Sequence, residues 1–129
     1  MPQDVERSGG CLCGAVRFVV RGKPLRVGRC HCQDCRRTSG SAFSFFAVWP
    51  RSALTGKGRL SSFDGRSFCR KCGSRVVHLR EDEAELMVGS FDAVPSDLTL
   101  DYELWIVRRE NWLDAHPGAV QYPRDREEP

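Results

Sequence analysis

The chain has 129 residues, of which 40% are hydrophobic, 9% aromatic and 29% charged, and its formal net charge is +3. A chain of this length forms one domain with a small core, to which bound metal ions or cross-links add stability. No apolar run reaches the roughly 18 residues that cross a bilayer, and residues 1–10 contain no secretory apolar segment, so a membrane or secreted protein is disfavoured and a cytoplasmic one expected.

Short strands make up most of the predicted elements. β-branched and aromatic residues indicate strands, in chain order, at residues 15–20, 25–29, 42–49, 59–63, 75–79, 85–88 and 102–107. One helix is expected at residues 33–39, ending at Gly40, and one turn at residues 50–53. The spacing of the strands, with glycine and proline between them, predicts a mainly β fold: one small domain of antiparallel sheets joined by zinc knuckles.

The two ends of the chain lack apolar anchors. Residues 1–8 are polar, and residues 123–129 are rich in charge and proline. Termini without anchors fray or lie over the surface. We therefore expect a flexible N-terminus at residues 1–8, a zinc-binding domain at residues 9–122 and a flexible tail at residues 123–129.

Seven cysteines stand in three groups along the chain. They are Cys11 and Cys13, then Cys30, Cys32 and Cys35, then Cys69 and Cys72. An odd number cannot pair completely within one chain, and clustered cysteines in a reducing compartment bind metal more often than they form disulfides. Gly14 and Gly73 each follow a cysteine, and glycine accepts the positive φ of the tight turns that bring two sulfurs onto one ion.

The spacing divides the cysteines most simply between two zinc ions. One ion would take the four outer cysteines, Cys11, Cys13, Cys69 and Cys72, which is the pattern of a closed, structural site. The other would take Cys30, Cys32 and Cys35 and keep one coordination position open, which is the pattern of a catalytic zinc. Seven thiolates and two Zn²⁺ ions would bring the formal net charge of +3 to zero, which argues against a polyanionic partner.

Other divisions of the cysteines are open. The chain could hold only the four-cysteine site, with the other three cysteines as plain thiols. His31 or Asp34 could instead supply a fourth ligand to the three-cysteine site. His31, however, lies between two ligands, and in an extended strand its side chain points away from both sulfurs. His78 and His116 stand alone in the sequence and are expected to be packing or surface residues.

Three thiolates around one Zn²⁺ ion carry a formal charge of −1, which suits the binding of a thiol better than the activation of water. Arg36 and Arg37 directly follow Cys35. They either attract a substrate carboxylate or balance the charge of the site.

The sequence assigns no acid or base for the reaction. Glu103, Asp34 and His31 are the candidates, and no motif supports any of them. Aromatic residues cluster after the three central cysteines, and we expect them in the core rather than in the wall of a pocket. They are Phe43, Phe45, Phe46 and Trp49.

Three cysteine motifs together carry a family resemblance. They are GCLCGAV at residues 10–16, CHCQDCRR at residues 30–37 followed by Ser39 and Gly40, and FCRKCG at residues 68–73. With them the chain resembles the glutathione-dependent formaldehyde-activating enzyme (GFA) family, which includes animal centromere-associated relatives. GSFD at residues 89–92 and the aromatic segment 105–112 are also similar to that family. The resemblance covers about residues 9–122, and all seven cysteines match in order and spacing.

The resemblance implies a β-tent fold of small antiparallel sheets. It also implies a structural zinc at the outer four cysteines and a catalytic zinc at Cys30, Cys32 and Cys35, in agreement with the division made from spacing. The implied activity is that of a carbon–sulfur lyase, which joins glutathione and formaldehyde into S-hydroxymethylglutathione or cleaves this adduct. The expected partners are a small thiol such as glutathione, and formaldehyde or another small aldehyde. No glutathione-contacting residue is carried over.

Two other functions compete with this interpretation. One is a non-catalytic zinc module that binds a protein partner or handles metal, which predicts either a closed three-cysteine site or an open one indifferent to small thiols. The other is a nucleic-acid-binding zinc ribbon, which the neutral metal-loaded charge and the lack of a basic aromatic stripe disfavour. The strand at residues 42–49 offers an edge for dimerisation, but the sequence leaves the oligomeric state open.

Overall fold

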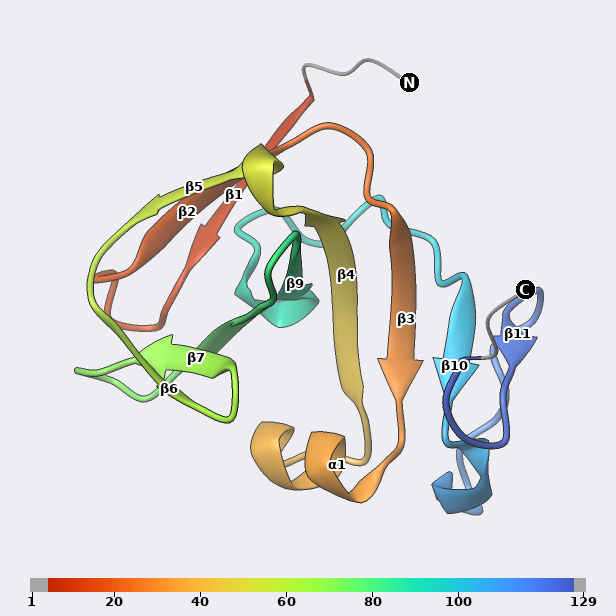
Figure 1. Cartoon of the computed structure of the whole chain (residues 1–129). Coiled ribbons are helices and arrows are strands. Elements are labelled where there is room, and N and C mark those ends of the chain that lie inside the picture. The colour runs from red at the N-terminus through yellow and green to blue at the C-terminus, as the bar shows by residue number, and fades with distance from the viewer. Residues whose placement is uncertain (1–4, 127–129) are drawn as a thin grey trace. The chain divides into compact units, whose positions relative to one another are not determined.

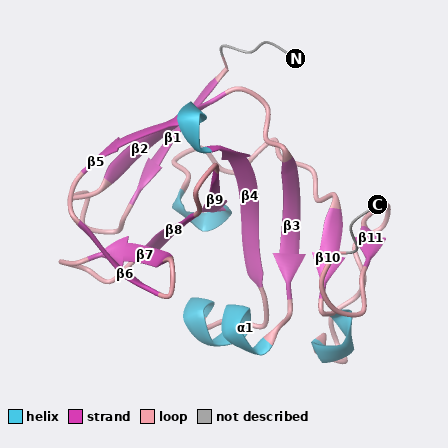
Figure 2. Ribbon diagram, in the orientation of Figure 1, coloured by secondary structure: helices cyan, strands magenta, loops and turns pink. Residues whose placement is uncertain are grey.

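The structure, a computed structural model, describes residues 5–126 and is mainly β (Figure 1, Figure 2). The chain divides into two compact units: unit 1 comprises Met1–Arg26 and Ala47–Asp97, and unit 2 comprises Val27–Phe46 and Leu98–Pro129. It passes between them inside two strands, β3 (Arg26–Cys30) and β4 (Ser44–Pro50), and a third time after Asp97. Each unit contains one group of clustered cysteines.

Unit 1 contains a three-stranded antiparallel sheet in the order β1-β2-β5. Its strands are β1 (Glu6–Gly10), β2 (Arg17–Arg21) and β5 (Leu54–Lys57). Along β2 the buried residues Phe18 and Val20 alternate with more exposed ones. Because successive side chains of a strand point to opposite faces, this alternation gives the sheet one apolar face.

The other strands that lie within unit 1 are also antiparallel and follow the order β9-β8-β7-β6. They are β6 (Leu60–Phe63), β7 (Arg66–Cys69), β8 (Arg75–Leu79) and β9 (Glu83–Met87). A change of register between Ser67 and Phe68 bends β7 just before its last residue, Cys69. Two short 3₁₀ turns, η1 (Arg51–Ala53) and η2 (Val88–Ser90), complete the unit.

Trp49 lies at the centre of the core of unit 1. Its side chain is fully buried, and its Nε1 donates a hydrogen bond to the Gly22 carbonyl at 3.0 Å, so its one polar atom is satisfied. The Trp49 ring centroid lies 5.8 Å from that of Phe91, which lies 5.5 Å from that of Phe18, and both pairs are edge-to-face. This aromatic residue therefore fills the core, as the sequence predicted.

Unit 2 holds strands in the order β11-β10-β3-β4, and its C-terminal strands are β10 (Tyr102–Leu104) and β11 (Val120–Gln121). A short 3₁₀ turn, η3 (Ile106–Arg108), follows β10. β10 runs parallel to both β3 and β11, whereas the sequence analysis expected antiparallel pairs alone. Parallel neighbours need a long crossover connection, and residues 31–101 separate β3 from β10. No local sequence signal marks such a distant pairing.

Gly28 on β3 lies beneath two aromatic rings of unit 2. The rings of Phe46 and Tyr102 meet edge-to-face, with centroids 6.0 Å apart. A Cβ atom at Gly28 would lie 2.8 Å from Tyr102 Cζ and 2.9 Å from Phe46 Cζ. Only glycine therefore lets the backbone of β3 approach this ring pair.

Helix α1 (Gln33–Ser39) begins and ends as predicted. Gly40 adopts φ 64°, the left-handed conformation that ends many helices. At the other end Cys32 is the N-cap residue, and its Sγ accepts a hydrogen bond from the Cys35 amide at 3.3 Å. The start of the helix thus holds two of the three central cysteines.

The predicted fold class is confirmed, and each predicted strand overlaps an observed one. The sequence analysis missed β1, β5, β7 and β11, which are short and poor in β-branched residues. β1 begins at Glu6, inside the stretch expected to be flexible, and the Trp105 amide donates to the Arg124 carbonyl at 3.0 Å inside the expected tail. Residues 1–4 and 127–129 lie outside the described residues. Among residues 5–126, no helix is long and apolar enough to cross a bilayer.

The packing at Gly28 yields a stability prediction. Gly28→Ala should lower the free energy of unfolding by about 1–3 kcal/mol, because the new methyl group must displace two buried rings. Gly89→Ala is the control, since its Cβ would meet no atom within 4 Å. Urea unfolding followed by circular dichroism compares the two variants with the wild type. Equal midpoints for the two variants would contradict the close packing described for Gly28.

Candidate metal centres

The four outer cysteines come together in unit 1. The Sγ atoms of Cys11, Cys13, Cys69 and Cys72 all lie within 4.8 Å of one another. Two of the separations are 3.6 Å, between Cys11 and Cys13, and 3.8 Å, between Cys13 and Cys69. A tetrahedral zinc with Zn–S bonds of about 2.3 Å holds its sulfurs about 3.8 Å apart, whereas a disulfide holds them about 2.05 Å apart. The donor set and its spacing therefore fit a metal ion such as zinc.

Two tight turns place these sulfurs. The turn after β1 is closed by the Gly14 amide, which donates to the Cys11 carbonyl at 3.2 Å, and the turn after β7 by the Gly73 amide, which donates to the Cys69 carbonyl at 2.8 Å. Gly14 has φ 82° and Gly73 has φ 81°, so both turns use the freedom that only glycine has. The sequence analysis predicted both glycines in this role.

Backbone amides and a serine hydroxyl surround the sulfurs of unit 1. The Val16 amide donates to Cys11 Sγ at 3.2 Å. Ser74 Oγ lies 3.2 Å from Cys72 Sγ, and this hydroxyl together with the Ser74 amide lowers the pKa of Cys72 to about 5. Ser74 Oγ also accepts a hydrogen bond from the Leu12 amide at 3.0 Å, which joins the two turns. Because the thiolate is the form that binds metal, these donors prepare the cluster for an ion.

The three central cysteines come together in unit 2. The Sγ atoms of Cys30, Cys32 and Cys35 lie within 4.8 Å of one another. Cys30 ends β3 and is buried, while the other two begin α1 and are half-buried. Among the described residues, no ligand atom of another histidine, cysteine, aspartate or glutamate joins this group, so neither His31 nor Asp34 supplies a fourth donor here. We call these three residues the triad.

Thiol protons must leave the triad before it can bind an ion. The side chain of Cys35 and burial both raise the pKa of Cys30 above its ordinary value. Metal binding at such a site therefore releases protons and is weaker in acid.

His31 points away from the sulfurs, as the alternation of a strand predicts. Its side chain is fully buried, its ring lies 5.7 Å from that of Phe43, and its Nε2 lies 2.7 Å from Oε1 of Glu103. A carboxylate only accepts hydrogen bonds, so Nε2 carries the proton and donates it. In the described part of the chain, Nδ1 has no hydrogen-bond partner.

Glu103 reaches His31 because β10 pairs with β3 in parallel, which sets Glu103 beside Arg29 and Leu104 beside Cys30. The carboxylate also accepts hydrogen bonds from Arg29 Nε at 2.6 Å, from the His116 amide at 2.8 Å and from Gln121 Nε2 at 3.0 Å. Burial acts to raise the pKa of Glu103, but these donors, Arg29 above all, outweigh it and hold the pKa below its ordinary value. Glu103 is thus an ionised carboxylate in the interior of unit 2.

The structure separates the three acid–base candidates. It brings His31 and Glu103 into direct contact, whereas Asp34 lies exposed in the first turn of α1. Sequence reasoning missed the partners of Glu103, of which only Arg29 carried a signal. Arg29 is on β3 and His31 directly follows that strand, two residues later, so extended backbone directs both side chains to the same face.

The other candidates have ordinary structural roles. Arg36 Nη2 donates to Glu110 at 2.6 Å, so its guanidinium has a carboxylate partner within unit 2, while Arg37 is exposed. His78 is half-buried on β8, and burial together with nearby arginines lowers its pKa to about 4, so it is a neutral packing residue. His116 is exposed, and only its backbone amide meets Glu103.

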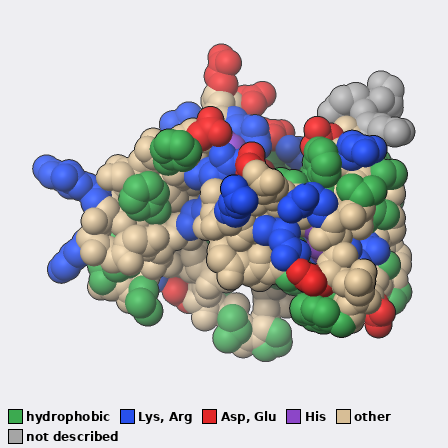
Figure 3. Space-filling view, turned by 90° about the horizontal axis from the view of Figure 1, so that it is seen from below, with side chains coloured by type: hydrophobic (Ala, Val, Ile, Leu, Met, Phe, Trp, Pro, Cys, Tyr) green, Lys and Arg blue, Asp and Glu red, His purple; other side chains and the backbone are tan. Residues whose placement is uncertain are grey.

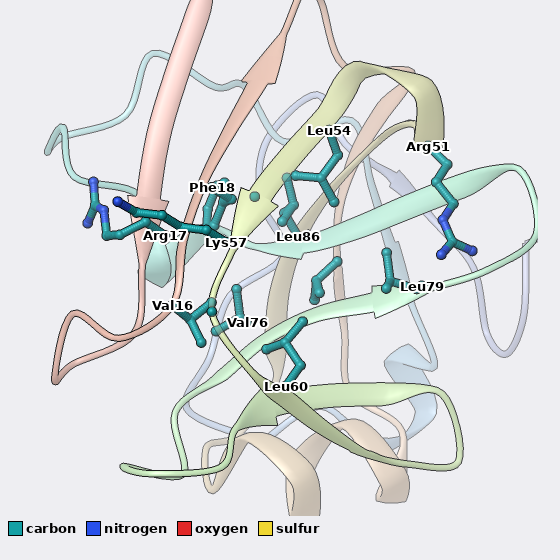
Figure 4. Close-up of a pocket in the computed structure, with 13 residues that line it drawn as sticks. Val16, Arg17, Phe18, Arg51, Leu54, Lys57, Leu60, Val76, Leu79 and Leu86 are labelled. Carbon is teal, nitrogen blue, oxygen red and sulfur yellow. The ribbon is translucent and has the colours of Figure 1, made fainter.

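Unit 1 also has a cavity of about 270 Å³, shown in Figure 4. Its wall is mostly apolar and includes Phe18, Leu54 and Leu86, with Arg17, Arg51 and Lys57 as its charged residues. None of the seven cysteines lines it. The cavity is therefore not the open side of either cysteine group. On the face shown in Figure 3, basic side chains are interspersed with acidic ones.

Comparison with known proteins identifies the family to which the chain belongs. The family model described as glutathione-dependent formaldehyde-activating enzyme matches residues 6–108, which include all seven cysteines. The chain belongs to the GFA family. The resemblance read from the cysteine motifs is thereby confirmed.

Individual relatives agree with this membership. An uncharacterized lyase of Schizosaccharomyces pombe is 32% identical over 76 residues, or 55% of this chain, and the match spans only 56% of that relative's own length. A Halomonas elongata protein that carries the provisional name of a glutathione-dependent formaldehyde-activating enzyme is 29% identical over 82% of this chain and 78% of its own. A Rhodobacter sphaeroides protein of known crystal structure is 26% identical, with a TM-score of 0.55, and the match covers 89% of this chain and 98% of that one.

The two GFA cysteine groups should bind metal independently. We expect two zinc ions per wild-type chain and one in each of the variants Cys72→Ser and Cys35→Ser, measured by plasma mass spectrometry of the purified protein. Cys72→Ser should lose far more thermal stability, because a closed structural zinc contributes roughly 10–16 kcal/mol of apparent binding energy. A Cys35→Ser protein that keeps both ions, or loses both, would contradict the division into two sites.

Proposed function

We propose that this protein is a zinc-dependent carbon–sulfur lyase that acts on the adduct of a small thiol and a small aldehyde. Glutathione and formaldehyde are the substrates that membership of the GFA family favours. The observation that carries the proposal is the triad: three cysteine sulfurs gathered within 4.8 Å of one another, with no fourth ligand atom from the described residues. Such a site keeps a place for a ligand from solution.

The two cysteine groups have different roles in this proposal. Cys11, Cys13, Cys69 and Cys72 supply four donors, which is a complete tetrahedral set, so this site is structural. Cys30, Cys32 and Cys35 supply three, so this site is the catalytic one.

In the proposed reaction the sulfur of the thiol bonds to the carbonyl carbon of the aldehyde. The C=O π pair moves to the oxygen, which takes up a proton as the thiol loses one, and the product is a hydroxymethyl thioether. A zinc ion held by thiolates supplies a position that binds a soft sulfur donor and stabilises it as thiolate. The reverse reaction breaks the same carbon–sulfur bond.

The residues of the triad contribute geometry and charge. Three thiolates around a divalent cation leave the site with a formal charge of −1, which favours a neutral aldehyde over an anionic electrophile. The Cys35 amide, which donates to Cys32 Sγ at 3.3 Å, offsets part of the negative charge on that sulfur. Burial of Cys30 keeps water from one side of the site. A cytoplasmic location is part of the proposal, because none of the seven cysteines forms a disulfide and a reducing compartment keeps thiols reduced.

A cobalt titration tests the proposed thiol site. Co²⁺ exchanged for zinc at both sites gives visible bands from its sulfur ligands, and added glutathione should shift the bands of the triad alone. The expected result is a saturable shift of about half of the absorbance, which is absent from Cys35→Ser, while the bands of the four-cysteine site stay unchanged. Lyase activity is then measured as the rate of S-hydroxymethylglutathione formation above the uncatalysed rate.

Oxidised glutathione, which has no free thiol, is the negative control of the titration. If two cobalt ions bind and glutathione leaves the spectrum unchanged, the proposal of a thiol site is wrong. A non-catalytic zinc module for a protein partner or for metal handling would then be the better description.

A further inference from the structure

Glu103 is a charged group that the proposed chemistry does not use. It is 0% exposed, as is His31, and it lies on β10, which is parallel to β3 in unit 2 (Figure 1). Burying a carboxylate costs several kcal/mol unless hydrogen bonds and counter-charges offset the loss of water. The contacts of a buried carboxylate therefore indicate which parts of the chain it holds together.

The donors to Glu103 come from two distant stretches of the chain. Arg29 and His31 belong to β3 and the residue after it, and they donate to Oε1 at 2.6 Å and 2.7 Å. The His116 amide and Gln121 Nε2 belong to the C-terminal stretch, and they donate to Oε2 at 2.8 Å and 3.0 Å. The carboxylate therefore fastens the end of β3 to the C-terminal part of unit 2.

The residues fastened in this way alternate with the ligands. In the order 29 to 32, the chain reads Arg, Cys, His, Cys, with the first and third side chains directed to Glu103 and the second and fourth belonging to the triad. Because the backbone is extended, rotating the peptide groups around His31 would turn Cys30 and Cys32 as well. The Leu104 carbonyl, which accepts from the His31 amide at 3.0 Å, restrains the same peptide.

We propose that Glu103 is a positioning residue for the triad: by holding Arg29 and His31, its carboxylate fixes the directions of the Cys30 and Cys32 sulfurs. Hydrogen-bond partners of this kind, one step behind the ligands, commonly change metal affinity by about 10–100-fold when they are removed. The proposal gives a role to two of the acid–base candidates, which act here through the ligands. It rests on the triad being the metal site of the proposed function, but it concerns metal geometry and needs no substrate.

Glu103→Gln tests the proposal, because the amide keeps the size of the side chain and removes its charge. In the variant, Co²⁺ should bind the triad about 10–100-fold more weakly, and at full occupancy its visible bands should shift. The four-cysteine site of unit 1 serves as an internal reference and should keep its affinity and spectrum. The difference from the spectrum of Cys35→Ser, which keeps the four-cysteine site alone, isolates the bands of the triad.

Glu83→Gln is the matched control. Glu83 is half-buried in unit 1 and pairs with Arg26 through two hydrogen bonds of 3.1 Å and 2.7 Å, so its loss also breaks an arginine–carboxylate pair. It should leave the triad spectrum unchanged. If Glu103→Gln fails to fold, Gln121→Met decides, because it removes one donor from Glu103 and should shift the triad bands in the same direction by less.

Two results would overturn the proposal. One is a triad whose cobalt affinity and bands are the same in Glu103→Gln, or in Gln121→Met if that variant decides, as in the wild type. The other is an equal loss of affinity at both cysteine sites, which would show that Glu103 supports stability in general. Neither result bears on glutathione binding by the wild type, so failure here is distinguishable from failure of the proposed function.

Discussion

The repulsion between closely spaced sulfurs is the constraint on which the structure depends. Each unit gathers thiols until their Sγ atoms lie within 4.8 Å of one another, although thiolates at such distances repel. A shared cation would relieve that repulsion, and the turns, caps and amide donors around the sulfurs hold them at a spacing that fits such an ion. In unit 1 two glycine turns and Ser74 do this, and in unit 2 the end of β3 and the first turn of α1 do.

The two cysteine groups differ in their number of sulfurs and in the side chains that lie beside them. In unit 1, two pairs of cysteines supply four sulfurs, which is a complete tetrahedral set of ligands. In unit 2, β10 instead contributes the Glu103 carboxylate, which contacts Arg29 and His31 and no cysteine sulfur. The strand thus adds no ligand atom to the triad, and the proposed thiol would take the position that three sulfurs leave open.

The sequence predicts those features that depend on neighbours along the chain. Helix α1, its end at Gly40, the glycines of the two turns and the grouping of the cysteines all follow from short spacings. It does not predict the role of Glu103, because the contact with His31 spans residues 31–103 and depends on a parallel pairing that leaves no periodic signal. The C-terminal partners of Glu103 carry no local sequence signal either. One of them is a backbone amide, and every residue except proline can supply that donor.

The alternation along residues 29–32 makes this stretch intolerant of changes in length. Inserting or deleting one residue between Gly28 and Cys32 would exchange the two faces of the strand for every position beyond it. A sulfur would then face Glu103, and a histidine or arginine would face the other two thiols. A substitution in this stretch can weaken a single contact. A shift of register would disrupt both the grouping of the three sulfurs and the buried pair of Arg29 and Glu103.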